Sequence, residues 1–209
     1  MDTTQAPARP RSLTPLYLLL AVSLAPVLFA LAAYYIPALG LRPAESNAYG
    51  QLIEPQRSVP AQALLPLQTL DGQAFDLQSL RGRWVLVSAD DSACPESCVR
   101  KLFILRNSHA SQGKNVDRLA RVWFVTDSGQ PSEQILEAYK GTHMLRADPQ
   151  QLAPFLAPGA PGQAPEQAVK NGMWIIDPNG NLMMAFPGDA DPLKVRTDIR
   201  KLLNNSRIG

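Results

Sequence analysis

Two cysteines, Cys94 and Cys98, are the only ones in the 209-residue chain, and they lie at the junction of two different segments. The apolar run at 84–89 before them predicts a buried strand, and the segment from Val99 onward predicts a helix. This layout places the thiols at a helix N-terminus, where free N–H groups and the helix dipole favour thiolate over thiol. Residues four apart on a helical turn share one face, so the two sulfurs can hold one soft metal ion or form a disulfide.

A second feature is the segment 13–41, which contains no charged side chain. About 20 apolar residues span the hydrocarbon core of a bilayer, so the segment predicts one transmembrane anchor within the lipid bilayer. Arg9 and Arg11 precede it, which favours a cytoplasmic tail over residues 1–12. The sequence Ala30-Leu31-Ala32 has the form of a signal-peptide cleavage site, so a cleaved leader is the alternative.

Both alternatives place the two cysteines outside the cytoplasm, in a compartment where disulfides form and persist. We therefore expect a single-pass protein of the bacterial inner membrane with a periplasmic C-terminal domain, or the mitochondrial inner-membrane equivalent. The net charge of +2 is small and no basic cluster is present, so nucleic acid is not an expected partner.

The remaining sequence divides into a linker and one domain. Residues 42–62 contain Pro43, Pro55 and Pro60 with little periodicity, and they predict a linker. Residues 63–209 have the size of one ordinary domain. In chain order, the expected elements begin with a hairpin at 67–77, a strand at 84–89, a helix at 99–112 and a strand at 121–126. Helices at 131–139 and 148–155 follow, and a flexible loop at 157–164 comes after them. A hairpin at 173–186 and a closing helix at 191–204 complete the domain.

This alternation predicts an α/β fold in which a mixed sheet is flanked by helices, because parallel strands are linked through helices and the last hairpin adds antiparallel strands at one edge. A thioredoxin-like fold has this order of elements. The sequence therefore predicts a thioredoxin-like domain preceded by one N-terminal transmembrane helix.

Several blocks of the chain resemble the Sco/SenC family, whose members are membrane-anchored, thioredoxin-fold copper proteins that assist the copper site of cytochrome c oxidase. The resemblance covers roughly residues 63–205. It rests on Cys94-Pro95-x-x-Cys98, on Thr126-Asp127 followed by Pro131, Ile135 and Tyr139, and on the segment 174–180. It implies copper as the cofactor, Cys94 and Cys98 as its ligands, and a cytochrome c oxidase subunit or its assembly proteins as partner.

The chain departs from that family at the third copper ligand, which is a histidine about eight residues before Asp177. That position falls on Val169, with Lys170 beside it, and neither side chain can bind copper. His143 is a candidate replacement by residue type, although it lies outside the region where the family's ligand sits. Asp90 and Asp91 also precede Cys94, and two carboxylates near the thiols are expected to raise the thiol pKa.

These residues predict a Sco-like assembly factor that acts through the Cys94–Cys98 dithiol, either by delivering copper or by reducing the copper-site subunit. General thiol–disulfide oxidoreductase activity is left open. It is less favoured because three residues separate the cysteines and no proline lies within 171–173. The alternative is a non-catalytic, disulfide-stapled binding module that scaffolds a membrane complex.

Overall fold

The computed structural model describes residues 13–36, 48–158 and 162–209, and the chain divides into the units Met1–Asn47 and Ala48–Gly209. The first unit contains α1 (Thr14–Tyr35), which has Pro26 in its interior. Among the described residues, α1 is the one helix that is long and apolar enough to cross a membrane, a test that a signal sequence also passes. The predicted tail at 1–12 and the end of the predicted anchor at 37–41 lie outside the described residues.

The second unit is built on one eight-stranded mixed sheet with the strand order β1-β8-β7-β4-β5-β6-β2-β3. Strands β4, β5 and β6 run parallel to one another, and the other neighbouring pairs are antiparallel. The strands are β1 (Gln51–Ser58), β2 (Leu67–Thr69), β3 (Ala74–Phe75), β4 (Trp84–Asp90), β5 (Leu119–Val125), β6 (His143–Arg146), β7 (Gly172–Ile176) and β8 (Asn181–Pro187).

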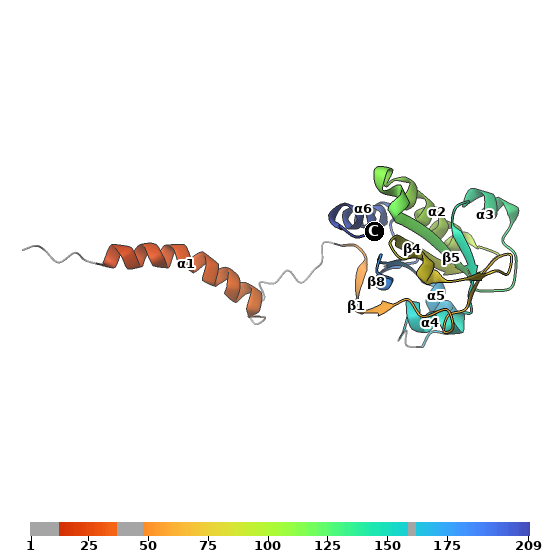
Figure 1. Ribbon diagram of the computed structural model, residues 1–209, viewed down its shortest axis with the longest axis horizontal. Coiled ribbons are helices and arrows are strands. Elements are labelled where there is room, and N and C mark those ends of the chain that lie inside the picture. Colours follow the sequence, from red (N-terminus) through yellow and green to blue (C-terminus); the bar gives the residue numbers. More distant parts are fainter. Residues whose placement is uncertain (1–12, 37–47, 159–161) are drawn as a thin grey trace, which may run out of the picture. The chain divides into compact units, whose positions relative to one another are not determined.

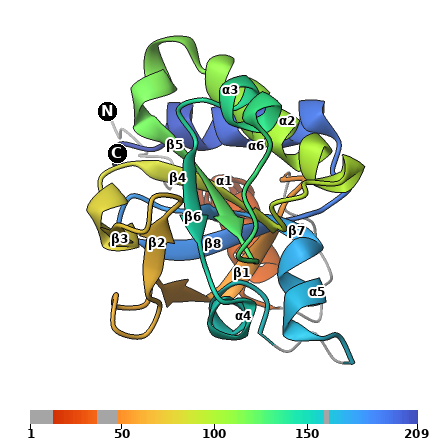
Figure 2. The same ribbon diagram turned by 90° about the vertical axis from the view of Figure 1, so that its right-hand side faces the viewer.

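Helices cover both faces of this sheet (Figures 1 and 2). Residues of α2 and α6 pack on one face in a cluster that includes both cysteines, and residues of α4 and α5 pack on the other face. The helices are α2 (Glu96–Ala110), α3 (Glu133–Ala138), α4 (Pro149–Leu156), α5 (Pro165–Lys170) and α6 (Pro192–Asn205), with short 3-10 turns at Leu77–Leu80 and Gly113–Arg118. The α/β, mixed-sheet architecture predicted from the sequence is confirmed.

The two central strands are buried along their whole length, because helices cover both of their faces. Every residue of β4 and β5 is buried, which explains their nearly continuous apolar sequences. Side chains alternate between the two clusters, so that Val85 and Val87 face α4 and α5 while Trp84 and Leu86 face α2 and α6.

Two segments differ from the sequence-based expectation. Residues 51–58, predicted as part of a linker, form β1, which pairs antiparallel with β8 and extends the sheet. Residues 165–170, which follow the predicted flexible loop, form α5 with Pro165 in its first turn. The neighbouring helix α4 begins as expected, because the Asp148 side chain accepts a hydrogen bond from Gln150 N and Pro149 occupies the first turn.

Candidate functional site

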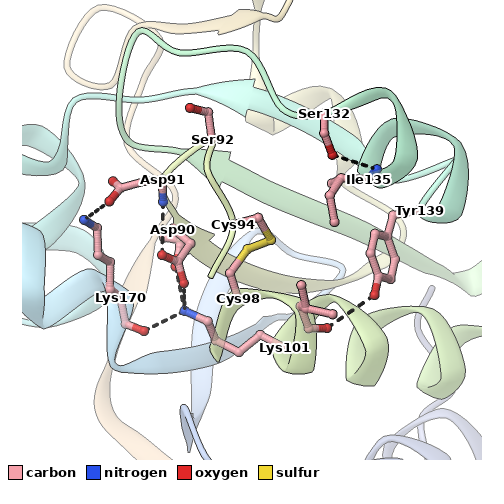
Figure 3. The surroundings of a disulfide bond; sticks show 12 residues. Asp90, Asp91, Ser92, Cys94, Cys98, Lys101, Ser132, Ile135, Tyr139 and Lys170 are labelled. Carbon is pink, nitrogen blue, oxygen red and sulfur yellow. Dashed lines mark hydrogen bonds and ion pairs between the residues drawn. A yellow bond between two sulfur atoms is a disulfide. The ribbon is translucent and has the colours of Figure 1, made fainter. Parts of the chain in front are cut away.

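The two cysteines are joined in a disulfide at the end of β4, with an S–S distance of 2.04 Å and Cα atoms 5.0 Å apart (Figure 3). Cys94 lies in the loop after β4, and Cys98 lies in the first turn of α2. Cys94 is 7% exposed and Cys98 only 1%. Both cysteines are therefore buried, and Cys94 is the more exposed of the two.

The backbone at Cys94 has an unusual conformation. Its φ is +42°, and among the described residues it is the one non-glycine position with positive φ. A side chain with a Cβ is strained in this left-handed region, and such positions concentrate at functional sites. The conformation turns the chain sharply between β4 and α2, with Cys94 N donating to Asp91 O at 3.0 Å.

One side of the disulfide is apolar. Ile135 packs against the cluster that contains both sulfurs, and Tyr139 belongs to that cluster. The Tyr139 hydroxyl donates to Val99 O at 3.3 Å, which joins the end of α3 to the first turns of α2. Burial raises the pKa of Tyr139, although the nearby charge of Arg106 opposes the shift. Figure 3 shows Ile135 and Tyr139 on the α3 side of the disulfide.

The other side of the disulfide is charged. Lys101 Nζ lies 2.9 Å from Asp90 Oδ2, and both side chains are almost fully buried. The same ammonium group donates to Ala89 O at 2.7 Å and to Lys170 O at 2.6 Å. Burial lowers the pKa of Lys101, and the neighbouring Asp90 carboxylate opposes this effect.

A second ion pair lies closer to solvent. Lys170 Nζ lies 2.6 Å from Asp91 Oδ2 and 2.6 Å from Glu166 Oε1. Thr126 Oγ1 donates to Asp91 Oδ1 at 2.7 Å. The sequence suggested two carboxylates acting on the thiols, but each aspartate has a lysine partner. Their negative charge is largely compensated, which weakens the reason to expect a raised thiol pKa.

An open groove of about 790 Å³ runs beside this charged side. It is lined by the N-terminal turns of α2, by α5 and by the loop after β8, including Pro95, Arg100, Lys170 and Gly188. Lys170, which neighbours the position expected for a third copper ligand, therefore lies at the groove and directs its ammonium group to Asp91. Val169 is fully buried in the core on the α4 and α5 face.

His143 does not approach the sulfurs. It lies in β6 in register with Val122, and its ring is 5.5 Å from that of Phe75. Val122 and Phe75 pack on the α4 and α5 face, whereas the cysteines pack on the opposite face of the sheet. Burial lowers the pKa of His143, and the charges of Arg83 and Arg121 lower it further.

The donors around the disulfide do not fit a bound copper ion. Among the described residues, no group of three or more His, Cys, Asp or Glu side chains is arranged to hold a metal. Both sulfurs are consumed by their mutual bond, and the charged side chains on one side of it form two lysine–aspartate pairs. An ammonium group has no lone pair for a metal and repels a cation. The arrangement suits thiol–disulfide chemistry, because the two sulfurs are already bonded and Cys98 lies at a helix N-terminus.

Comparison with known proteins identifies the domain. A family model described as "Transmembrane-like, thioredoxin-like, C-terminal domain" matches residues 84–206. The chain belongs to this family. The part that matches this transmembrane-like, thioredoxin-like domain runs from β4 into α6, so it contains both cysteines and both of the lysines that surround them. No curated protein matches the sequence significantly.

Solved structures share the fold at low sequence identity. BsSco, a member of the Sco family of cytochrome c oxidase assembly proteins with an identified disulfide switch, is 14% identical with a TM-score of 0.52 over 75% of this chain and 99% of its own. A thiol:disulfide interchange protein from Bacteroides sp. is 15% identical, with a TM-score of 0.52 over 73% of this chain and 91% of its own. A putative electron transfer protein from Aquifex aeolicus VF5 is 16% identical, with a TM-score of 0.51 over 71% and 92%. These similarities show a thioredoxin-like fold.

Proposed function

We propose that this chain is a membrane-anchored, Sco-like assembly factor that acts outside the cytoplasm by thiol–disulfide exchange. The proposed partner is the copper-site subunit of cytochrome c oxidase, whose cysteines it would reduce before copper loading. The observation that carries the proposal is the Cys94–Cys98 disulfide at a strand–helix junction, in which Cys94 is more exposed than Cys98. The proposed anchor is α1, and Arg9 and Arg11 support a cytoplasmic N-terminus.

The reaction transfers two electrons to the partner. In the reduced chain, the Cys94 thiolate attacks one sulfur of a partner disulfide, and the second partner sulfur leaves as a thiolate. The Cys98 thiolate then attacks Cys94 in the mixed disulfide, which closes the Cys94–Cys98 bond and releases the first partner sulfur. The two protons lost by Cys94 and Cys98 are taken up by the partner thiolates. A dithiol reductant outside the cytoplasm returns the chain to its reduced form by the same exchange.

The surroundings favour each step of this exchange. Cys98 lies in the first turn of α2, where backbone N–H groups and the helix dipole stabilise the thiolate that must attack the mixed disulfide. The lysine partners of Asp90 and Asp91 reduce the repulsion that those carboxylates would exert on a thiolate. The fold shared with BsSco, which has a disulfide switch, and with the Bacteroides thiol:disulfide interchange protein adds support.

Copper delivery is the second route that the resemblance implies, and the residues present do not favour it. His143 lies on the opposite face of the sheet, and Val169 and Lys170 offer no ligand. We therefore assign no step to a bound copper ion.

The reduction potential of the Cys94–Cys98 pair tests the proposal. The full chain in detergent would be equilibrated with glutathione buffers, and its free thiols counted by alkylation and mass spectrometry. A working dithiol has a potential above about −300 mV, whereas a structural bridge lies below it. A value below that limit contradicts the proposal and supports a disulfide-stapled scaffold instead.

A trapping experiment tests the partner. The variant C98S retains Cys94 but cannot resolve a mixed disulfide, so it is expected to accumulate a covalent adduct in membranes. Mass spectrometry of that adduct is expected to identify the copper-site subunit of the oxidase. The variant C94S is the matched control, because it retains only Cys98, the less exposed of the two cysteines, and should form no adduct. Adducts with unrelated proteins only would contradict the oxidase role while leaving the exchange chemistry intact.

A further inference from the structure

An aspartate that follows β5 holds the segment that leads into Cys94. The two carboxylate oxygens of Asp127 accept hydrogen bonds from Ser92 N at 3.0 Å and from Ser92 Oγ at 2.9 Å. Ser92 precedes Cys94 by two residues and is buried. Hydrogen bonds to a carboxylate are roughly twice as strong as those between neutral groups. Asp127 therefore anchors a segment that lies 35 residues earlier in the chain.

The loop that carries Asp127 is itself fixed and lies close to Ser92. Arg146 in β6 donates from Nη1 to Asp127 O at 3.0 Å and to Gly129 O at 2.8 Å. A Cβ at Gly129 would collide with the Ser92 hydroxyl, so this position requires a residue without a side chain. The loop after β5 and the segment before Cys94 therefore fit closely together, and β6 supports the loop from its other side.

Thr126 holds the same segment at a second point. Its N–H donates to Asp90 O at 3.0 Å, and its hydroxyl donates to Asp91 Oδ1 at 2.7 Å. Asp91 O in turn accepts from Cys94 N at 3.0 Å. Figure 3 shows Asp91 and Ser92 on the segment that leads from β4 to Cys94. Hydrogen bonds therefore connect the end of β5 with the backbone of Cys94.

The segment ends in the unusual conformation of Cys94, whose φ is +42°. A residue with a Cβ is disfavoured in this left-handed region, so the conformation persists only where the surroundings impose it. Reduction of the disulfide removes one of these constraints, whereas the hydrogen bonds from Asp127 and Thr126 do not depend on the S–S bond. These bonds keep the Cys94 sulfur in the position from which the disulfide closes again.

We propose that Asp127 is a positioning residue that lowers the reduction potential of the Cys94–Cys98 pair, because it holds residues 91–94 in their disulfide conformation after reduction. Reduction then releases less conformational freedom, so the dithiol form gains less entropy and is the stronger reductant. The inference rests on the proposed thiol–disulfide exchange, and it assigns to Asp127 the tuning of that exchange toward reduction of the partner.

The redox equilibrium of the full chain in detergent with glutathione tests the proposal. The Cys94–Cys98 disulfide and two glutathione thiols become two cysteine thiols and one glutathione disulfide. We expect the equilibrium constant for this reduction to rise about tenfold in D127A, which corresponds to a potential about 30 mV higher. D127N should lie between D127A and the parent, because its amide oxygen still accepts from Ser92 N. S92A removes only the hydroxyl bond and should give a rise of about threefold, so it keeps the test valid if D127A does not fold.

The matched control is D177A. The Asp177 carboxylate accepts from Asn181 N at 2.8 Å and from Asn181 Nδ2 at 3.4 Å, so it forms one bond to backbone and one to a side chain, as Asp127 does. It follows Ile176, which pairs with Val85 at the start of β4, whereas the disulfide lies beyond the end of β4. D177A should lower Tm but leave the equilibrium constant at the parental value.

Two results would overturn the role of Asp127. In one, D127A and S92A both keep the parental equilibrium constant. In the other, D177A shifts the constant as much as D127A does. Dithiothreitol replaces glutathione where glutathione leaves the pair fully oxidised, so that the difference between variants is measured at any potential. A parental potential below about −300 mV contradicts the proposed exchange itself, whereas the role of Asp127 is judged from the difference between variant and parent.

Discussion

A buried lysine beneath the disulfide loop joins three elements through one ammonium group. Lys101 lies in α2, and its three acceptors belong to Asp90 and Ala89 at the end of β4 and to Lys170 at the end of α5. An ammonium group has three N–H donors, so this set satisfies it. Because the group is buried, its charge is tolerated only through this arrangement.

We predict that K101M lowers the free energy of unfolding by about 3–5 kcal/mol, because it leaves the Asp90 carboxylate buried without a counter-charge. The double variant D90N/K101M should lose less than the two single variants combined, since it removes both charges. Thermal unfolding of the full chain in detergent measures the effect. The exposed Lys114 provides the control, and K114M should change stability by less than about 0.5 kcal/mol. Equal losses of unfolding free energy in K101M and K114M would show that the buried Lys101–Asp90 pair does not stabilise the fold.

The Asp91–Lys170 pair gives a pH-dependent prediction. Burial raises the pKa of Asp91, but hydrogen bonds from Lys170 and Thr126 outweigh it, so the pKa lies below its usual value. Such a carboxylate stabilises the fold above its unfolded pKa of about 3.9, and this contribution is lost as the pH falls through the lower, folded pKa. We expect D91N to be less stable than the parent by about 0.5–1 kcal/mol near neutral pH.

The difference between D91N and the parent should shrink as the pH falls below about 4 and vanish in stronger acid. Thermal unfolding across this range measures it. D71N is a suitable control, because Asp71 is exposed in the β2–β3 turn and forms no ion pair among the described residues. A difference that stays constant with pH would assign the effect of D91N to something other than its charge.

The residues of the disulfide site were predictable from the sequence, but their supporting charges were not. Cys94 and Cys98 are the only cysteines of the chain and lie four residues apart, so the sequence alone predicts them as the site residues. Lys101 looks like an ordinary helix residue, since its acceptors at Ala89 and Lys170 lie 12 and 69 residues away in sequence. Only tertiary structure reveals that such distant groups surround one ammonium.

At the scale of elements, β1 and α5 escaped prediction for different reasons. The burial of β1 does not alternate, with mostly exposed residues along it, so the period-two signal of a half-buried strand is absent. Residues 51–58 form a strand because they pair with β8, which lies more than a hundred residues away in the sequence. α5 has six residues and follows a segment rich in proline and glycine, and so short a helix leaves little periodic signal.

The entry into β1 depends on one buried carboxylate of α6. Asp198 is 3% exposed, and its Oδ2 accepts hydrogen bonds from Tyr49 N at 2.6 Å and from Gly50 N at 2.9 Å. We predict that D198A destabilises the domain by about 1–3 kcal/mol, because it leaves buried N–H donors unsatisfied. The loss should be local as well as global, with faster amide hydrogen exchange over residues 48–58.

D148A is the control for this effect. Asp148 caps α4, so its replacement removes a comparable side-chain-to-backbone hydrogen bond and costs about 1 kcal/mol. Hydrogen exchange at 48–58 should remain at the parental level in D148A. If D198A leaves exchange there unchanged, Asp198 does not position β1.

At the scale of the whole molecule, the alternation of strands and helices predicted the architecture because each signal was local. The hairpins at 67–77 and 173–186 carry turn sequences, Asp71-Gly72 and Asn179-Gly180, and the central strands carry continuous apolar runs. The extent of the sheet was underestimated, since the edge strand β1 comes from the segment interpreted as a linker. The domain therefore begins closer to the anchor in sequence than the composition indicated.

The last prediction concerns the anchor and the side of the membrane on which the disulfide domain lies. The uncharged 22-residue helix α1 is long enough to span a bilayer core, and Arg9 and Arg11 favour retention of the N-terminus in the cytoplasm. We expect the full chain, expressed in a Gram-negative bacterium, to resist extraction with alkaline carbonate and to keep its own N-terminus by mass spectrometry. Protease added to spheroplasts should digest residues 48–209.

L24R, which places a charge within α1 at a cost of about 2.5–3.5 kcal/mol, should weaken membrane retention, whereas L24F should not. A soluble product beginning just after Ala32 would instead identify α1 as a cleaved leader, and a protease-resistant domain would reverse the orientation.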